Sequence, residues 1–478
     1  MFSMNKLPDL ATLSHAEKDD LIRALFAQVT ALLAKVDALT SEVADLKGRL
    51  AKNSQNSSKP PSSDGYHKPN PKSERPTGQN PLGGQKGHAG RTLKKVAQPD
   101  YVEAHLPERE RCRVCQRTLP EPVLSETRPV FDIPVPAHVV TEHRLYTSVC
   151  ACGQAHRGHF PADVTAPVQY GQNIKAVVVE LLHQQRLPVA RTGALMGDLY
   201  GLPLSEASVI AFSQEAAERL QPLYASIAQA VTASPVVHAD ETGMRVAGRL
   251  NGLHGAVTEA LSFLGIHANR GSKAFADIGI LPDFRGTLIH DGLAAYRDLD
   301  CTHGLCNAHP LRELTYAAEE LDPPWAKKLH DLRVSACHEV NASGGILSDD
   351  RRVFYRWVYA FLLLEGEADN PEQPATGKRG RTPQTKAFNL LRRLRLFAED
   401  VWRFATDRNV PFTNNLAEQA VRMPKVKQKI SGGFRTLEGI QDFCVIRTCL
   451  ASLQKQKRGL FEALVLVFQG GTLSLNPA

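Results

Sequence analysis

Three carboxylates, those of Asp240, Asp291 and Glu418, could support metal-dependent chemistry if the fold brings them together. Asp240 lies near the end of a strand-like run that begins at Val236, and Asp291 directly follows the apolar run TLIH. Because side chains alternate along a strand, Glu241 is expected on the face opposite Asp240. If the two strands are neighbours, both aspartates reach the same edge of the sheet.

Phosphodiester cleavage by two metal ions needs such a group, because Mg²⁺ prefers hard oxygen ligands and the metal pair must contact both the attacking and the leaving oxygen. Glu418 is the candidate third acid, since it is the only acid between Asp407 and Glu438 and follows two asparagines that are expected to begin a helix. The 50 acids of the chain offer many triples, so the residues alone leave this set open.

Four bases follow Glu418 in the sequence: Arg422, Lys425, Lys427 and Lys429. One interpretation is an ordinary ion pair between Glu418 and Arg422, which lie one helical turn apart on a solvated surface. The other is a carboxylate placed beside a DNA backbone that the bases contact. Pro424 is expected to end the helix, because proline lacks the N–H that continues it, so the three lysines are assigned to the following segment.

Two cysteine pairs, Cys112-x₂-Cys115 and Cys150-x-Cys152, lie in the β-rich region 101–165. Four thiolates brought together by two turns match the tetrahedral preference of Zn²⁺, so a structural zinc module is expected, with His156 and His159 as reserve ligands. The gap between the pairs is longer than in a usual ribbon, and cysteines without a metal are the alternative.

The pattern around the acids predicts a mixed α/β fold. After a helical region at 166–233, which resembles a helix-turn-helix or a plain packing pair, the order is three strands, helix, strand, helix, strand. This is the order of a ribonuclease H-like domain, expected over residues 234–430 with a helical insertion at about 310–410. A C-terminal helical basic region is expected over 431–478.

The N-terminal segment, residues 1–51, carries an uninterrupted heptad repeat after the capping box SHAE. β-Branched residues dominate position a and leucine fills position d, a pattern that favours two parallel strands and predicts a homodimer; docking on the chain's own domain is the alternative. The a and d positions are Ile22, Val29, Val36, Val43 and Leu50, and Leu25, Leu32, Leu39 and Leu46. Residues 52–100 are expected to form a flexible basic tether that either only solvates or contacts DNA.

Charge is distributed unevenly along the 478 residues, which contain 57 bases and 50 acids. Residues 52–95 hold nine bases and two acids, a net +7, and residues 378–458 hold 18 bases and six acids, a net +12. Such segments indicate a polyanionic partner.

The start of the sequence shows no secretory signal, the apolar run ALVLVF is too short to span a membrane, and nine cysteines fit a reducing compartment, so a cytoplasmic, nucleoid-associated protein is expected.

Several motifs occur in the order typical of one family: KNSQNSSKPPSSD, GGQKGHAG, HADETG, IHDGLAAY, LCNAHPLREL and PFTNNLAEQAVRMPKVKQKISGGFRT. The chain resembles the transposases of the insertion sequence sixty-six family, which have a ribonuclease H-like catalytic domain of the DDE type. The resemblance implies that Asp240, Asp291 and Glu418 bind Mg²⁺ or Mn²⁺, and that the enzyme hydrolyses DNA at element ends and joins the freed 3′-hydroxyls to target DNA.

The resemblance also implies that accessory transposition proteins assist, and that Cys306 and His309 correspond to a C-x₂-H pair found between the second and third acids of several such enzymes. A buried thiol with a helix-capping histidine is the alternative for that pair. Thr413 departs from the family, which often has an acid at that position. A structure-selective nuclease on the same fold and a catalytically inert, zinc-containing DNA-binding regulator are the other functions considered.

Overall fold

The computed structural model describes residues 12–53, 56–57, 95–106, 110–133, 135–320, 323–375 and 382–475. Most of the expected tether, including GGQKGHAG, and most of the basic stretch KRGRTP lie outside the described residues. In the described ranges no helix is both long and apolar enough to cross a membrane.

The centre of the molecule is a five-stranded mixed sheet with the strand order β5-β4-β3-β6-β7. Strands β3, β4 and β5 form an antiparallel meander, and β6 and β7 extend it in parallel beyond β3. The expected three strands, helix and strand are present as β3, β4, β5, α5 (Ser272–Ile278) and β6, and a short 3₁₀ helix (Ala294–Asp298) stands where the second helix was expected before β7. The bounds are β3 Val236–Val246, β4 Arg249–Val257, β5 Ser262–His267, β6 Thr287–His290 and β7 Thr302–Leu305.

Helix α12 (Leu437–Lys455) covers the edge of the sheet at β5 with side-chain hydrogen bonds. The backbone N–H of Leu264 donates to Thr448 Oγ1 at 2.9 Å, and Ser452 Oγ accepts from the N–H of Ser262 at 3.0 Å and donates to its carbonyl at 3.1 Å. Tyr224 OH donates to the carbonyl of Leu264 at 3.0 Å. The exposed backbone groups of an edge strand are thereby satisfied, which prevents pairing with another chain.

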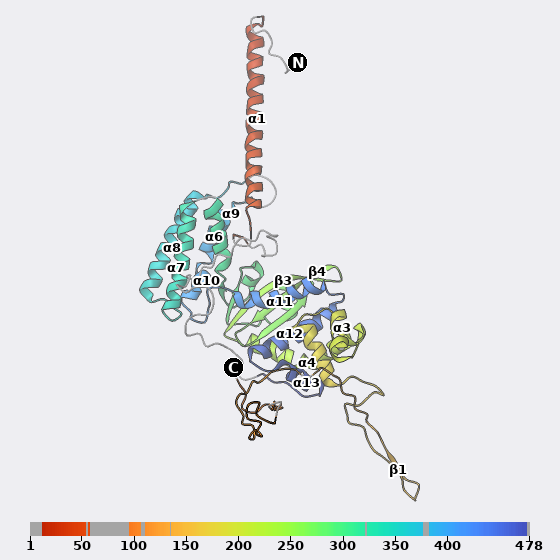
Figure 1. Ribbon diagram of the computed structural model, residues 1–478. Helices are drawn as coiled ribbons and strands as arrows, with labels where there is room; N and C mark the ends of the chain where they lie inside the picture. The colour runs from red at the N-terminus through yellow and green to blue at the C-terminus, as the bar shows by residue number, and fades with distance from the viewer. Residues whose placement is uncertain are drawn as a thin grey trace.

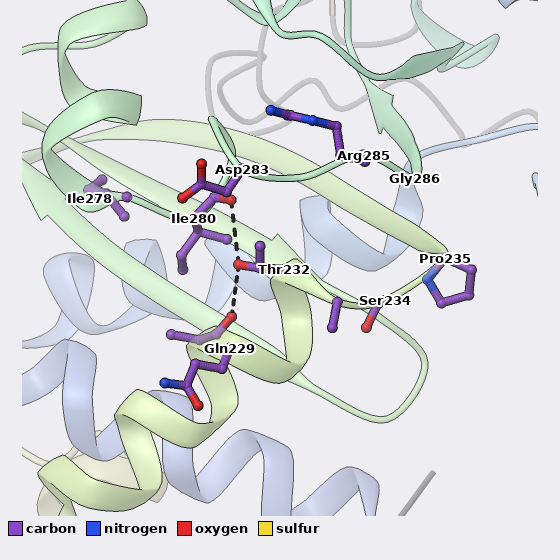
Figure 2. Close-up of a pocket in the computed structure, with 12 residues that line it drawn as sticks. Gln229, Thr232, Ser234, Pro235, Ile278, Ile280, Asp283, Arg285 and Gly286 are labelled. Atoms are coloured by element: carbon purple, nitrogen blue, oxygen red, sulfur yellow. Dashed lines mark hydrogen bonds between the residues drawn. The ribbon is translucent and has the colours of Figure 1, made fainter.

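A cavity of about 720 Å³ lies at the end of the sheet where β3 and β6 begin (Figure 2). Pro235 and Gly286, which precede the two strands, line it together with residues from the end of α4. Thr232 Oγ1 contacts the carbonyls of Ala228 and Ile280 at 3.1 and 3.5 Å there. This cavity is thus at the opposite end of β3 and β6 from Asp240 and Asp291.

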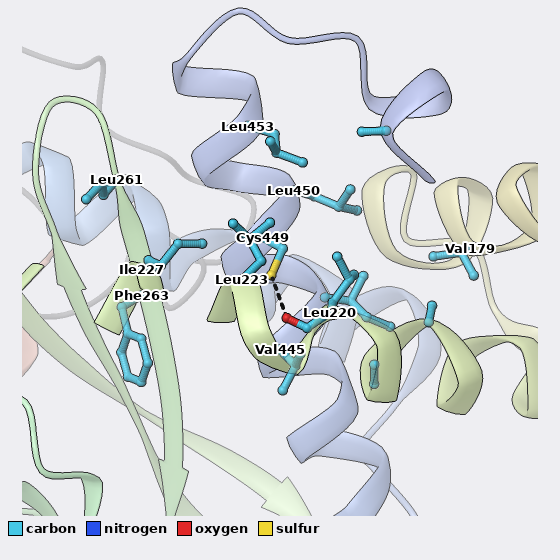
Figure 3. Packing of buried hydrophobic residues seen from close by; sticks show 14 of the residues in the cluster. Val179, Leu220, Leu223, Ile227, Leu261, Phe263, Val445, Cys449, Leu450 and Leu453 are labelled. Carbon is cyan, nitrogen blue, oxygen red and sulfur yellow. Dashed lines mark hydrogen bonds between the residues drawn. The ribbon is translucent and has the colours of Figure 1, made fainter. Parts of the chain in front are cut away.

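The largest core of the described residues joins the sheet to helices that precede and follow it in the chain (Figure 3). Leu220 and Ile227 of α4 pack with Phe263 of β5 and with Leu450 of α12 in one buried cluster. The regions 166–233 and 431–478, expected to be separate from the catalytic domain, therefore share its core. The helices concerned are α2 Gln172–Val179, α3 Val189–Tyr200, α4 Glu206–Thr232 and α13 Leu460–Phe468, besides α12.

Two bases in the C-terminal region have structural roles, whereas Arg435 and Lys457 are exposed. Arg447 is buried, and Lys455 Nζ donates to the carbonyls of Thr258 and Leu261 at 2.5 and 2.8 Å. Burial lowers the pKa of Lys455 to about 8. The predicted helical region is present, and its bases divide between structural positions and the surface.

The expected insertion between β7 and the Glu418 helix is helical and has its own core. Trp325, Leu329 and Leu391 are fully buried in it, and Ile289 of β6 joins this core to the sheet. In Figure 1 its helices form a group beside the sheet. They are α6 Ala308–Glu320, α7 Pro324–Ala342, α8 Asp349–Asp369, α9 Lys386–Leu396 and α10 Ala398–Trp402.

Helix α1 (His15–Leu50) extends away from the rest of the molecule (Figure 1). Its N-terminus has the expected capping box, in which Ser14 and Glu17 exchange hydrogen bonds. The nine a and d side chains are between 45% and 85% exposed. In this structure, therefore, the apolar side of α1 is not docked on the chain's own domain. Near the C-terminal end of α1, Tyr316 OH of the body donates to the carbonyl of Gly48 at 3.0 Å.

Candidate functional site

The parallel pairing of β3 with β6 aligns Asp240 with Asp291. His238 pairs with Ile289 in the register of the two strands, and each aspartate lies two residues beyond this pair at the C-terminal side. The two carboxylates interact electrostatically, as expected for neighbours at one edge. The two acids are therefore neighbours as expected, but Asp240 does not lie at the end of its strand, because β3 continues to Val246 beyond its parallel pairing with β6.

Asp240 is held in an environment that disfavours its charged form. Burial, together with the nearby carboxylates of Glu241, Asp291 and Glu418, raises the pKa of Asp240 to about 7, while a hydrogen bond from the N–H of Glu241 at 2.9 Å opposes this rise. A buried group of like charges is unfavourable unless something positive joins it. The arrangement is therefore suited to binding a cation.

Glu241 points to the other face of the sheet and has its own partners. Arg270 forms an ion pair with it at 2.7 Å, and Tyr296 OH donates to its second oxygen at 2.8 Å. The Glu241 side chain is only 3% exposed. Both of its carboxylate oxygens are satisfied, so Glu241 is a structural acid and does not compete with Glu418 as the third member of the site.

Asn414 fixes the start of the Glu418 helix, α11 (Asn415–Ser431), on the centre of the sheet. Its side chain donates to the carbonyl of Ala239 at 2.7 Å and meets His238 Nδ1 at 3.0 Å, and its backbone N–H lies 3.3 Å from Cys306 Sγ. Asn414 caps no backbone N–H of its own helix with its side chain. Glu418, one turn further on, is thus brought beside the strand that carries Asp240.

Gly255 of β4 allows α11 to lie close to the sheet. A Cβ atom at Gly255 would lie 3.1 Å from Cγ1 of Val421, which is tighter than most side-chain contacts. The glycine in this central strand therefore has a packing role, since the absence of a side chain permits close approach.

Glu418 has an oxygen free for a ligand. Its Oε1 atom is buried and has no hydrogen-bond partner, and among the described residues no ion pair joins Glu418 to Arg422. The surface ion-pair interpretation is therefore wrong for this structure. A buried acceptor without a donor is costly, and such groups call for a specific explanation.

Cys306 and His309 lie against the same glutamate. Their ligand atoms and one oxygen of Glu418 all lie within 4.8 Å of one another, and this is the only such group of three or more among the residues the structure describes. The carboxylates of Asp240, Asp291 and Glu418 are more widely spread than this. A pair of ions about 3.5–4 Å apart tolerates wider spacing of the acids than a single ion does.

Helix α11 runs through Pro424, so the expectation that it ends there is wrong. Pro424 lies on the buried face with Ala417, Val421 and Lys427, and α11 packs on β3 and β4. An interior proline costs about 3 kcal/mol or more in lost hydrogen bonding and crowding. Burial of this face against the sheet offsets that cost, and the three lysines therefore belong to α11 itself.

The four bases expected to contact DNA do not share one environment. Lys427 is buried, with its ammonium 5.3 Å from the ring centre of Phe434, and burial lowers its pKa. Lys425 is half-buried and donates to the carbonyl of Gly243. Lys427 therefore cannot face DNA in this fold, which corrects the prediction, while Arg422 and Lys429 are exposed.

The two cysteine pairs each come together but remain separate from one another. Cys115 lowers the pKa of Cys112, and Cys152 lowers that of Cys150, through hydrogen bonding within each pair. No three of these thiols lie within 4.8 Å of one another. Cys150 and Cys152 lie at the tip of the small hairpin of β1 (Thr147–Val149) and β2 (Ala155–Arg157), and the four-cysteine zinc site stays a prediction.

Sequence reasoning missed the positioning residues around the acids. Asn414 was assigned only to helix capping, and Arg270 and Tyr296, which hold Glu241, were not selected at all. The NN pair before the helix was a usable signal for Asn414. Tyr296 ends the motif IHDGLAAY, which was a usable signal, whereas no local pattern marks Arg270, because its partner is distant in the sequence.

Comparison with protein families gives two matches. A model of the Transposase IS66 family matches residues 167–442, and a model of a family of unknown function (DUF6444) matches residues 5–94. A search of curated proteins found no match. The first match covers more than half of the chain and includes both aspartates, Glu418 and the Cys306–His309 pair, so the chain belongs to the IS66 transposase family.

Proposed function

We propose that this member of the IS66 transposase family is a DDE-type enzyme with a ribonuclease H-like catalytic domain, and that Asp240, Asp291 and Glu418 hold its catalytic metal ions. The observation that carries the proposal is the proximity of the three acids: Asp240 and Asp291 lie just beyond the parallel pairing of β3 with β6, and Glu418, which has a buried oxygen without a donor, interacts electrostatically with Asp240. The mixed strand order β5-β4-β3-β6-β7 supports the fold assignment.

The acids fit Mg²⁺ or Mn²⁺ in chemical type. They supply hard carboxylate oxygens, their mutual repulsion and burial raise the pKa of Asp240 to about 7, and Glu418 Oε1 is an acceptor without a partner. When bound, the ions would stabilise charge on the attacking and leaving oxygens of a phosphodiester. The proposed reactions are hydrolysis at the element ends and transfer of the 3′-hydroxyls into target DNA.

The chain's own part in these reactions is positioning. Asn414 holds the start of α11 against β3, so Glu418 stays in reach of Asp240. The Arg270–Glu241–Tyr296 contacts fix the strand next to Asp240 from the other face of the sheet. A site held from both faces keeps the acids in place when a substrate arrives, which is what in-line phosphoryl transfer requires.

DNA would lie along the exposed face of α11. Asn415, Gln419, Arg422 and Lys429 are exposed and recur at helical spacing on the side away from the sheet. Arg422 and Lys429 are therefore the proposed phosphate contacts, and Lys425 adds positive charge close to β3. A phosphate backbone there would pass beside Glu418, and its affinity would fall steeply with salt.

The proposed assembly is a homodimer joined by parallel pairing of α1. The support is a stripe of apolar a and d side chains, all exposed along a helix that projects from the body. Such a seam is stable in water only when a partner helix covers it. Structural zinc at Cys112, Cys115, Cys150 and Cys152, and accessory transposition proteins, remain parts of the proposal taken from the sequence.

The test is cleavage and strand joining on duplex DNA taken from the flanks of this chain's own gene, with Mg²⁺ or Mn²⁺. Asp240→Asn, Asp291→Asn and Glu418→Gln are each expected to lower the rate by at least about 10³-fold, the scale of losing electrostatic stabilisation at a reacting centre. Glu438→Gln makes the same chemical change at an exposed acid and should keep the wild-type rate.

The alternatives give distinct results in the same assay. A folded triad variant that retains the wild-type rate would remove that acid from the site. Cleavage without joining by the wild type would favour a nuclease, and specific DNA binding with neither reaction would favour the regulator.

A further inference from the structure

The group Cys306, His309 and Glu418 differs in chemistry from the acid pair beside it. One sulfur, one imidazole nitrogen and one carboxylate oxygen lie within 4.8 Å of one another. Thiol and imidazole ligands suit Zn²⁺ and similar transition metals, whereas Mg²⁺ takes oxygen ligands and binds thiols poorly. These three side chains therefore form a candidate site for a transition-metal ion, whereas the three acids form a candidate site for Mg²⁺.

The fold brings these residues together through two adjacent helix starts. The backbone N–H of Asn307 donates to the carbonyl of Phe412 at 3.0 Å, and that of Asn414 reaches Cys306 Sγ at 3.3 Å. These bonds tie the segment before α6 to the segment before α11. His309 and Glu418, in the first turns of the two helices, thereby come to face the same space.

Two ligand-capable atoms in this group have no partner in the structure. Glu418 Oε1 and His309 Nδ1 are both buried and make no hydrogen bond. The Cys306 side chain is itself buried, with 1% of its surface exposed. Other buried atoms without partners occur in the described chain, but here two of them, from different helices, lie beside a buried thiol within ligand distance of one another, a combination suited to a metal ion.

We propose that Cys306, His309 and Glu418 bind one divalent transition-metal ion, with Zn²⁺ as the expected occupant, and that this ion competes with the catalytic Mg²⁺ for Glu418. Tetrahedral zinc bonds of about 2.0–2.3 Å put ligand atoms roughly 3.3–3.8 Å apart, so the side chains need to move by about an ångström. Three protein ligands leave the fourth position open. The competition rests on the proposed function, whereas the metal site itself does not.

Occupancy of this site would remove Glu418 from the acid set. A glutamate oxygen bound to a zinc ion between α6 and α11 is turned toward Cys306 rather than toward Asp240 and Asp291. Zn²⁺ would then act as an inhibitor of a Mg²⁺-dependent reaction. The Cys306–His309 pair would set the sensitivity to that inhibition without contacting the DNA.

The test uses Co²⁺ as a spectroscopic probe of the full-length protein. The other cysteine pairs could bind Co²⁺ too, so Cys112, Cys115, Cys150 and Cys152 are first replaced by serine in all samples. One equivalent of Co²⁺ should produce a thiolate-to-metal charge-transfer band and the visible bands of a tetrahedral site. Both should be lost in Cys306→Ser and in His309→Ala.

Cys337→Ser is the matched control, because Cys337 is a half-buried thiol of α7 outside any metal-ligand group of the described chain. It should keep the Co²⁺ spectrum. Circular dichroism of each metal-free variant checks folding, and His309→Ala keeps the test decisive if Cys306→Ser does not fold. Absence of the bands, or their persistence in either ligand variant, would overturn the site.

The competition is measured separately. Zn²⁺ should inhibit Mg²⁺-dependent DNA cleavage by the quadruple-serine protein, and the inhibiting concentration should rise about tenfold or more in Cys306→Ser. Equal inhibition of both proteins would overturn the competition. A Co²⁺ spectrum from a protein that cleaves no DNA would leave the metal site standing and refute the proposed function; cleavage without a spectrum would do the reverse.

Discussion

Replacing Asp240 by asparagine should stabilise the metal-free protein at pH 8 relative to wild type, and by less at pH 5. Burial and neighbouring carboxylates raise the pKa of Asp240 from 3.8 to about 7. The folded state therefore holds the Asp240 proton more tightly than the unfolded state does. Its contribution to stability is fully present below pH 3.8 and is lost as the pH rises through about 7.

The size of the effect follows from the shift. A difference of about three pKa units corresponds to roughly 4 kcal/mol once both states are deprotonated. Between pH 5 and pH 8 the wild type should lose about 2–3 kcal/mol that the asparagine variant, which does not titrate, keeps. Other effects of the substitution, such as an altered hydrogen bond to the N–H of Glu241, add a constant that does not depend on pH.

The assay is urea unfolding of both proteins in a chelator at several pH values. Asp19→Asn, which removes an exposed carboxylate on α1, serves as the control and should leave the pH profile unchanged. A gap between Asp240→Asn and wild type that stays constant or narrows toward pH 8 would refute the picture of a crowded, buried acid. Added Mg²⁺ should stabilise wild type at pH 8, since it binds only the folded state, but not the variant.

Two further substitutions test how the site and the assembly are built. Asn414→Ala removes both side-chain bonds to β3, so DNA cleavage should fall about tenfold or more while the Co²⁺ spectrum of the quadruple-serine protein weakens; unchanged values of both would show that Asn414 does not position α11. Leu32→Asp places a charge in the α1 seam and should convert a dimer to a monomer in analytical ultracentrifugation, whereas Ala34→Asp on the outer side should not, and a monomeric wild type would refute the coiled coil.

Local sequence patterns were sufficient where the structure depends on neighbours in the chain. The capping box and heptads predicted α1, because both signals arise within a few turns of one helix. The apolar runs before Asp240 and Asp291 predicted the two strands, and β6 ends directly before Asp291 as expected, whereas β3 continues past Asp240 to Val246. The register that places the two acids side by side required only that the strands be adjacent.

Predictions failed where packing with distant segments decides the outcome. Pro424 has the local character of a helix terminator, yet α11 continues because its buried face, including Pro424, packs against the sheet. Lys427 looked like a DNA contact because lysine is usually solvated, but its position on that same face puts it against Phe434. If the helix is continued through Pro424, helical periodicity places Lys427 on a different face from Arg422 and Lys429.

The domain boundaries show the same limit on a larger scale. α4 ends directly before β3, and its buried side chains lie in one cluster with those of α12, more than 200 residues later. No composition shift along the chain marks such a shared core, because every segment in it is an ordinary amphipathic helix. Domain boundaries predicted from local sequence patterns therefore separated helices whose apolar side chains are buried against each other.

The repulsion among the buried acids explains why hydrogen bonds and an ion pair hold the strands and helix around them. Gathering buried carboxylates around Asp240 opposes folding at neutral pH by several kcal/mol, on the scale of a whole domain's net stability. In the metal-free protein, other contacts must hold the acids in place. Asn414 on one face of the sheet and Arg270 on the other make such contacts. An ion that binds the acids then offsets the cost at the site, so metal affinity and fold stability are coupled through the same side chains.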